Sequence, residues 1–359
     1  MPQLKVRIGC VVLAVVMSAV TYYFVEPRLR WGRFGGYKAA GLLCAMILVG
    51  VAGYSIHRHD GYTARMDDPE QKMIDVLTKG FREAKQRCLS RFPDWNSKIA
   101  GGEFVCRLQR GLGKNNIAVI GDSHAIQLYP GLVANVRKDE GIAVFPAGCA
   151  IPLIGLHSNA DSAALKRIPL HVHTEHLLSE AFNYILRQKN IKKVVLSHHP
   201  SCSWNNVVDT FNPENHDFNS ILHDGFVRTY DALTKAGKEI YVILDNPSFS
   251  KENYLQCKSS AIRRPWSVPF VSYKKAHACT VKQFEVKEKR PWNNWNKTSR
   301  ELAANYKNIH FIDLEKVFCR NGTCSMLDNK GHLLYRDQNH LNIKGSMIAA
   351  PYIFKELRE

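Results

Sequence analysis

The stretch VIGDSHAIQLYPGL, residues 119–132, joins the end of an apolar run to the start of an amphipathic segment. Residues 117–120 are apolar without interruption, which is typical of a strand buried on both faces, and residues 125–138 have the apolar spacing of a helix. The glycine and polar residues between them indicate a tight turn. Ser123 is therefore predicted to lie where a buried strand gives way to a helix.

The same alternation continues to the end of the chain. Apolar runs that predict strands recur at 142–145, 193–196, 240–244 and 309–312, and helical spacing recurs near 175–189, 222–236, 293–306 and 343–357. This order predicts an α/β fold, a doubly wound parallel sheet of about five strands between two helical layers. Ligands of such sheets bind beyond the carboxyl ends of the strands, which is the edge predicted for Ser123.

Two long apolar segments precede this domain. Residues 8–25 carry no charge and residues 35–56 carry one, Lys38, so each can cross a hydrocarbon core of about 30 Å as a helix. A cleaved signal peptide is disfavoured, because YYFVEPRLR offers no small-residue cleavage site. The arginines between the two segments favour a turn on the cytoplasmic side. We therefore expect a transmembrane hairpin over 1–57, a linker and helix over 58–85, and an extracytoplasmic domain over 86–359.

The cysteines agree with that orientation. The chain has ten, of which Cys10 and Cys44 fall in the apolar segments, and the other eight follow residue 57. An even number in an oxidising compartment indicates disulfides. Cys319 and Cys324 flank the turn-forming RNGT and are the pair that we expect first. No C-x-x-C spacing occurs, so no zinc or other metal site is expected.

The net charge of the chain is +17. A field of that sign suits an anionic membrane surface, a phosphorylated glycan or nucleic acid. Nucleic acid is the least favoured of the three, because the basic residues are not interleaved with aromatics and no recognition-helix pattern occurs.

Two residues near the C-terminus make Ser123 a candidate nucleophile. Asp337 and His340 follow the last predicted strand and precede the last predicted helix, so they are expected at the same edge of the sheet. A serine hydroxyl needs a base to take its proton, and a carboxylate can hold the imidazole by its other nitrogen. The alternative is structural: Asp122 or Ser123 would cap the helix that follows, Asp337 would be another cap, and His340 would be a solvated residue at a helix start.

The motifs GDSH (121–124) and D-x-x-H-L-x-x-x-G (337–345) resemble those of the SGNH hydrolase superfamily, most closely the SGNH domains fused to acyltransferase family 3 membrane proteins. GCAIP (148–152), FIDLEKVFCRNGTCSM (311–326) and LLYRDQNHLNIKG (333–345) also match that subgroup, and YYFVEPRLRW (22–31) is similar to the end of its membrane domain. The resemblance implies a three-layer sandwich of the SGNH or flavodoxin type. It also implies that Ser123 is the nucleophile, His340 the base and Asp337 the partner that orients the base.

The chain departs from the superfamily pattern in two places. The resemblance implies an oxyanion hole built from the Ser123 N–H, a glycine after the second strand, for which Gly148 is the candidate, and an asparagine after the third. No asparagine stands at the end of VVLSHHPSCSW (194–204), so His198 or His199 is an alternative donor, and Ser123 with Gly148 alone is another. Family members also carry many membrane helices before this point, whereas this chain holds the last two, as a truncated protein, a split partner or a sequence with a misannotated start would.

The same resemblance implies an O-acyltransferase, and more specifically an O-acetyltransferase, that modifies hydroxyls of cell-surface polysaccharide or lipopolysaccharide through an acyl ester on Ser123. No bound cofactor is expected; the acetyl donor, derived from acetyl-CoA, would come through a multi-span acyltransferase membrane protein or a missing membrane domain. The expected location is the bacterial inner membrane, with the C-terminal domain in the periplasm or outside the cell. Two alternatives stay open: a carbohydrate acetylesterase with the same triad, and an inactive glycan-binding remnant.

Overall fold

The structure is a computed structural model of the chain. It describes residues 4–30, 35–58, 81–95, 106–109, 115–148, 150–158, 174–199, 207–261, 279–283 and 293–359. The chain divides into two compact units, Met1–Lys72 and Met73–Glu359. The division falls within the segment 58–85 that the sequence predicts to be a linker and helix, and a helix is present over residues 81–91.

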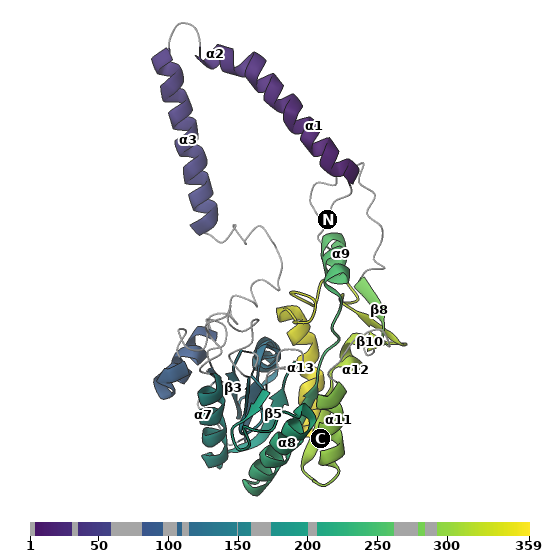
Figure 1. The fold of residues 1–359 in the computed structure, drawn as a ribbon. Helices are drawn as coiled ribbons and strands as arrows, with labels where there is room; N and C mark the ends of the chain where they lie inside the picture. Colours follow the sequence, from purple (N-terminus) through teal and green to yellow (C-terminus); the bar gives the residue numbers. More distant parts are fainter. Residues whose placement is uncertain are drawn as a thin grey trace. The chain divides into compact units, whose positions relative to one another are not determined.

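The first unit holds two apolar helical segments. α1 (Leu4–Val20), the π-helical η1 (Thr21–Val25) and α2 (Glu26–Arg30) follow one another, and α3 (Gly35–Arg58) comes next (Figure 1). Ile8–Arg28, with a mean hydropathy of 2.2, and Gly35–Arg58, with 2.1, are long and apolar enough to cross a membrane. Their apolar side chains are exposed instead of packed in a protein core, as contact with lipid requires.

The second unit is built on a sheet of six strands in the order β1-β3-β2-β5-β7-β9. Its strands are β1 (Arg107–Gln109), β2 (Asn115–Gly121), β3 (Glu140–Pro146), β5 (Ile191–Ser197), β7 (Glu239–Leu244) and β9 (Ile309–Asp313). All pair in parallel except β1, which runs antiparallel to β3 at one edge. The predicted α/β fold and its five parallel strands are confirmed, and β1 is an addition that the sequence analysis did not predict.

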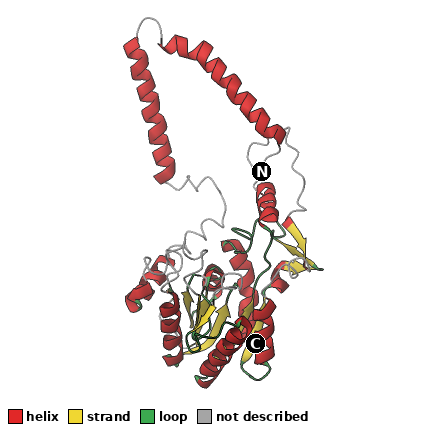
Figure 2. Cartoon of the chain, viewed as in Figure 1, coloured by secondary structure: helices red, strands yellow, loops and turns green. Residues whose placement is uncertain are grey.

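Helices cover both faces of the sheet (Figures 1 and 2). α7 (Thr174–Arg187), α8 (Phe218–Lys235) and α11 (Asn293–Ala303) pack on one face, and α5 (Ser123–Ile126), α6 (Tyr129–Asn135) and α13 (Ile343–Arg358) pack on the other. Alternate residues of the central strand β2 pack into the hydrophobic cores on the two faces of the sheet. Ala118 and Ile120 face the first group of helices, and Ile117 and Val119 face the second.

The single helix expected near 125–138 is instead two short helices, α5 and α6. Pro130 lies in the first turn of α6, where its missing N–H would interrupt a continuous helix. The break leaves Gln127 at the C-cap of α5. α6 then packs closely on α13, because a Cβ on Gly131 would lie 2.1 Å from the carbonyl oxygen of Ser346. The Gly131 N–H donates to the hydroxyl of Ser346 at 2.9 Å.

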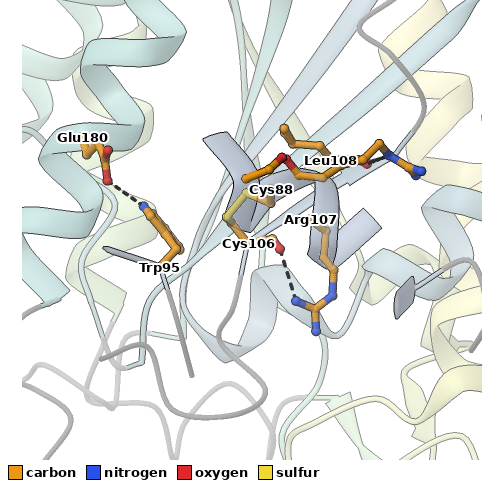
Figure 3. The surroundings of a disulfide bond; sticks show 8 residues. Cys88, Trp95, Cys106, Arg107, Leu108 and Glu180 are labelled. Atoms are coloured by element: carbon orange, nitrogen blue, oxygen red, sulfur yellow. Dashed lines mark hydrogen bonds between the residues drawn. A yellow bond between two sulfur atoms is a disulfide. The ribbon is translucent and has the colours of Figure 1, made fainter. Parts of the chain in front are cut away.

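A disulfide ties the helix over residues 81–91 to the edge of the sheet (Figure 3). Cys88 is bonded to Cys106, which directly precedes β1. Trp95, the last residue of the 3-10 helix η3 (Pro93–Trp95), is fully buried and donates its indole N–H to Glu180 of α7 at 3.1 Å. These contacts hold the N-terminal part of the second unit against the sheet that carries the site.

Two further disulfides lie in the C-terminal half. Cys257 of α9 (Lys251–Ala261) is bonded to Cys279, which precedes β8 (Thr280–Lys282). Cys319 of β10 (Cys319–Arg320) is bonded to Cys324 of β11 (Thr323–Ser325), as the sequence predicts. Their turn is Asn-Gly with positive φ at both residues, 50° and 73°, which is the two-residue hairpin turn that asparagine and glycine favour. Cys149 and Cys202 lie outside the described residues.

Short strands complete the unit. β8, β10 and β11 form a small sheet of three strands, and β4 (Leu156–Ser158) pairs with β6 (Val207–Asp209). α12 (Glu315–Phe318) connects β9 to β10.

Candidate active site

Ser123 is the first residue of α5, at the carboxyl end of β2. The glycine before it is required by the approach of the neighbouring strand: a Cβ on Gly121 would lie 1.7 Å from the carbonyl oxygen of Ser197 in β5. Only a residue without a side chain allows these two strands to run so close together. The helix cap is Asp122, whose Oδ1 accepts the N–H of His124 at 2.7 Å. Ser123 is thereby free of the capping role.

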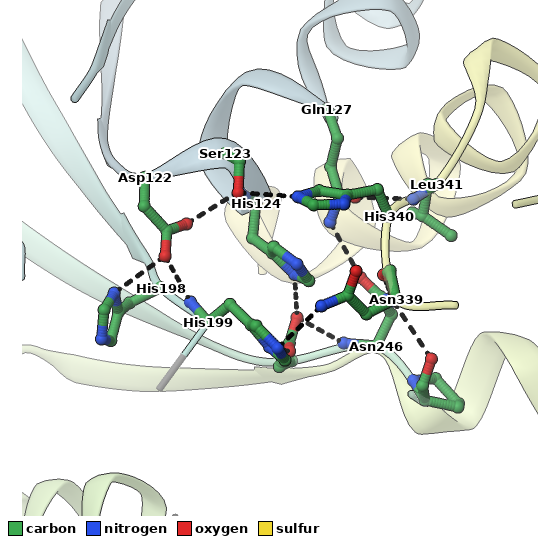
Figure 4. A network of polar contacts seen from close by, with 12 residues as sticks. Asp122, Ser123, His124, Gln127, His198, His199, Asn246, Asn339, His340 and Leu341 are labelled. Carbon is green, nitrogen blue, oxygen red and sulfur yellow. Dashed lines mark hydrogen bonds and ion pairs between the residues drawn. The ribbon is translucent and has the colours of Figure 1, made fainter. Parts of the chain in front are cut away.

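The structure brings the three predicted site residues together, and Figure 4 shows two of them, Ser123 and His340. The Oγ of Ser123 lies 2.7 Å from Nε2 of His340, and Nδ1 of His340 lies 2.7 Å from Oδ2 of Asp337. The other carboxylate oxygen of Asp337 accepts the backbone N–H groups of Asn339 at 3.0 Å and of His340 at 2.8 Å. In this geometry the imidazole can accept the proton of the serine hydroxyl while the carboxylate holds its opposite nitrogen.

The electrostatics of Asp337 suit that arrangement. Partial burial alone would raise the pKa of its carboxyl, but the hydrogen bonds from the His340 side chain and from the two backbone N–H groups outweigh it. The pKa of Asp337 therefore lies below its ordinary value, and the group is ionised at neutral pH. Its negative charge stabilises the imidazolium that forms when His340 takes a proton.

A buried cluster of His124, His199 and Asp245 lies beside these residues and was not predicted from the sequence. Nδ1 of His124 is 2.6 Å from one oxygen of Asp245, and Nδ1 of His199 is 2.7 Å from the other. The two imidazole rings are stacked with centroids 4.3 Å apart, and the ring of His124 lies 4.8 Å from that of His340. The signal that could have found Asp245 is its place directly after the apolar run of β7, at the same sheet edge as Ser123.

The same cluster has metal-ligating chemistry. One ligand atom from each of His124, His199 and Asp245 lies within 4.8 Å of the others, and among the described residues this is the one such group. Both carboxylate oxygens of Asp245 lie within hydrogen-bond distance of an imidazole Nδ1, whereas the buried Nε2 of His124 has no hydrogen-bond partner within the part of the chain that the structure describes. Burial lowers the pKa of His124 and so favours its neutral form. Burial raises the pKa of Asp245, but its two imidazole partners overcome that effect and hold it well below the usual range.

Amide side chains connect the cluster to the turn that carries His340. Gln127 accepts the N–H of Leu341 at 2.6 Å and donates to Oδ1 of Asn246 at 2.9 Å. Asn246 donates to the carbonyl oxygen of Asn339 at 2.8 Å, and the Asn339 amide lies 2.8 Å from Nε2 of His199. Asn339 lies within the motif LLYRDQNHLNIKG, but the sequence assigns no role to it, to Gln127 or to Asn246.

The oxyanion donors stay a prediction, but the structure bears on each candidate. Gly148 follows β3, and the N–H of its neighbour Ala147 donates to the carbonyl of Gly121 at 2.8 Å, which puts this loop beside Ser123. The two histidines suggested in place of the missing asparagine are engaged elsewhere. His198 lies with Nδ1 3.0 Å from buried Asp122, and both ring nitrogens of His199 have partners. Asp122 also accepts the backbone N–H of His199 at 2.8 Å.

Comparison with known proteins adds a family and several similar folds. Residues 87–355 match the family model described as the SGNH domain fused to AT3 domains. No curated protein matches the chain. Among solved structures, the periplasmic domain of a lipopolysaccharide acetyltransferase from Salmonella ser. Paratyphi A is 20% identical with a TM-score of 0.47, over 69% of this chain and 85% of that one.

Two esterases are also similar in fold. The acetyl xylan esterase AlAXEase is 13% identical with a TM-score of 0.38, over 67% of this chain and 98% of that one. The psychrotrophic esterase EstA from Pseudoalteromonas sp. is 8% identical with a TM-score of 0.32, over 68% of this chain and 97% of that one.

Proposed function

The chain belongs to the family of SGNH domains fused to AT3 domains, and on that premise we propose that it is an O-acyltransferase which carries its acyl group as an ester on Ser123. The observation that supports this role most directly is the pair of 2.7 Å contacts that link Ser123 to His340 and His340 to Asp337. The acyl group that we propose is acetyl, and the acceptor is a hydroxyl of cell-surface polysaccharide or lipopolysaccharide.

The reaction has two halves, each with one proton transfer to the base and one from it. His340 Nε2 takes the proton of Ser123 while Oγ attacks the carbonyl carbon of the acyl donor, and the base then gives that proton to the leaving group. An ester on Ser123 results. A sugar hydroxyl next gives its proton to His340 and attacks the ester carbonyl, and the base returns the proton to Ser123. Asp337 stays ionised throughout and stabilises the imidazolium in both halves.

The negative charge that develops on the carbonyl oxygen needs hydrogen-bond donors. We assign this role to the backbone N–H groups of Ser123 and Gly148, because both follow strands that end at the same edge of the sheet. Removing one such donor from an active site of this kind costs on the order of 10² to 10³ in kcat.

The location and partners that we propose follow from the rest of the chain. The two apolar helices would anchor it in the bacterial inner membrane, and the three disulfides among the described residues fit a second unit in the periplasm or outside the cell. An acetyl donor derived from acetyl-CoA would reach Ser123 through a multi-span membrane acyltransferase, the kind of domain to which this family is fused.

A carbohydrate acetylesterase is the second candidate, and one observation favours it. The side chains of His340 and Asp337 are 20% and 37% exposed, so water can reach the base and compete with a sugar hydroxyl for the acyl-enzyme. The two functions share the first half of the reaction and differ in the acceptor alone.

The experiment that separates them measures where the acetyl group goes. The detergent-solubilised chain is given an aryl acetate with and without envelope polysaccharide, and both free acetate and O-acetylated glycan are quantified. A transferase delivers acetyl to the glycan, and added glycan raises the rate of aryl alcohol release. Recovery of all acetyl as free acetate at every glycan concentration would favour the esterase. Ser123→Ala should abolish both products.

A further inference from the structure

We propose that Gln127 and His199 are positioning residues, which hold the turn of residues 337–341 so that His340 meets Ser123. This inference rests on the proposed acyl transfer at Ser123. Neither residue contacts the reacting atoms; each acts through the backbone or side chain of the turn, hereafter the base turn.

The base turn needs support from outside. Residues 337–340 belong to neither a helix nor a strand, and His340 and Asp337 are partly exposed. The internal bonds of the turn, from Asp337 to the following N–H groups and from Arg336 N–H to the His340 carbonyl, fix its shape. They do not fix its distance from the helix that carries Ser123. That distance decides whether the base can take the serine proton.

Gln127 supplies the first connection. It lies at the C-cap of α5, the helix that begins at Ser123, and it is 7% exposed. Its Oε1 accepts the N–H of Leu341, the residue after His340, at 2.6 Å. Its amide group donates to Oδ1 of Asn246 at 2.9 Å, which fixes which end of the amide faces the turn. A closed ring of contacts results, from Ser123 through α5 to Gln127, across to Leu341, and through His340 back to Ser123.

His199 supplies the second connection, at Asn339 in the middle of the base turn. The Asp245 carboxylate can only accept, so Nδ1 of His199 carries the proton and donates to it at 2.7 Å. The lone pair of Nε2 is then available to the Asn339 amide, which lies at 2.8 Å. The low pKa of Asp245 keeps this tautomer in place at neutral pH.

His199 makes its connection from the end of a strand, and Gln127 makes its connection from helix α5 with its amide bonded to Asn246 (Figure 4). His199 lies just beyond the end of β5, and Asp245 and Asn246 directly follow β7. Leu341 forms a β-bridge with Tyr335, and the Gln338 carbonyl accepts the N–H of Phe249 at 2.8 Å. The base turn is also tied at Asn339 and at Leu341 to residues that follow neighbouring parallel strands and to the helix of the nucleophile. A displacement of about 1 Å at a reacting group can cost on the order of 10²-fold in rate, so the loss of either connection should be measurable.

The test compares substitutions that keep or remove the hydrogen bonds of Gln127 and His199. Gln127→Met keeps the length of the side chain and loses both hydrogen bonds. His199→Asn places a donor near the position of Nδ1 and can bond Asp245 alone, whereas His199→Gln can place an acceptor near the position of Nε2 and keep the bond to Asn339. Gln256→Met, on the exposed face of α9, is the matched control for a Gln-to-Met change.

Two readouts are measured on the full chain in detergent. The first is hydrolysis of an aryl acetate: Gln127→Met and His199→Asn should lower kcat on the order of 10²-fold with KM and Tm little changed, and His199→Gln should recover most of that loss. Gln256→Met should behave as the wild type. If kcat falls equally in His199→Asn and His199→Gln and Tm falls in both, the inference is overturned, because His199 would then act on folding alone.

The second readout is crystallographic and does not need turnover. The Ser123 Oγ to His340 Nε2 contact should exceed hydrogen-bond distance in Gln127→Met and in His199→Asn and persist in His199→Gln. If the contact persists in all three variants, the positioning inference is wrong while the proposed function stands. If the wild type shows no Ser123-dependent turnover, the proposed function fails, and the crystallographic distances still decide whether these residues position the base.

Discussion

Replacing Asp337 by asparagine should reverse the tautomer of His340 and leave the base turn intact. The carboxylate makes two kinds of contact: Oδ2 with Nδ1 of His340 at 2.7 Å, and Oδ1 with the N–H groups of Asn339 and His340. The amide oxygen of asparagine can keep the second kind. Its NH₂ group would then face Nδ1, which must become the acceptor. The proton moves to Nε2, where it faces Ser123, and the imidazole can no longer take the serine proton.

The expected fall in kcat follows from the loss of one function of Asp337, which is to hold His340 in the tautomer that can accept the serine proton. A base in the wrong tautomer reduces kcat on the order of 10⁴-fold, which corresponds to about 5.4 kcal/mol of transition-state stabilisation. Ser123→Ala and His340→Ala should cost more, on the order of 10⁶-fold, because they remove the attacking group or the base itself. Asp337→Ala differs from Asp337→Asn in stability, since it also loses the two backbone contacts, each worth about 1 kcal/mol.

The assay is steady-state hydrolysis of an aryl acetate by the four purified variants, with Tm measured on the same samples. We expect the kcat of Asp337→Asn to lie between that of the wild type and those of Ser123→Ala and His340→Ala. Its Tm should be close to that of the wild type, whereas Asp337→Ala should have a lower Tm. The reasoning is refuted if Asp337→Asn turns over at the wild-type rate, because the carboxylate would then not set the tautomer of the base.

Three further predictions concern stability and the sheet. The pKa of buried His124 lies below its ordinary 6.5, so the unfolded chain takes up this proton at a higher pH than the folded chain does, and Tm should begin to fall as the pH drops through 6.5. The pKa of Asp245 is also lowered, so Tm should fall further below pH 3.8, and Asp245→Asn should reduce this second fall. Gly121→Ala puts a Cβ 1.7 Å from a β5 carbonyl, so it should destabilise the fold by about 1–3 kcal/mol in denaturant titrations and displace the nucleophile, with a fall in kcat. Reduction of the Cys319–Cys324 bond, which closes a loop with a sequence separation of 5, should cost about 2 kcal/mol, and alkylation should label both thiols only after reduction.

The parallel strands could be predicted because burial on both faces requires uninterrupted apolar runs, as in residues 117–120 and 240–244. β1 could not, since it is three residues long and carries Arg107 and Gln109 at an edge. The break between α5 and α6 was missed although Pro130 marks it, because the apolar spacing continues across the break.

The residues of the site likewise divide into those that could be predicted from the sequence and those that could not. Ser123, Asp337 and His340 stand out because each follows a predicted strand and has the chemistry of a nucleophile, a carboxylate or a base. Gln127 does not, and His199 was considered only as an oxyanion donor, because their partners lie far away in the sequence and an amide or imidazole leaves no periodic pattern. Contacts of this kind become visible only when the ends of β2, β5 and β7 meet at one edge of the sheet.

The most direct test of the central claim is to trap the acyl group on the chain. The detergent-solubilised protein is mixed with an aryl acetate, quenched in acid within the first turnovers, and analysed by intact mass and peptide mapping. The account predicts one added acetyl group, carried by the peptide that contains Ser123, absent from Ser123→Ala, and lost when a glycan hydroxyl or water is allowed to react. Turnover without any acetyl on Ser123, or with the acetyl on another residue, would contradict it.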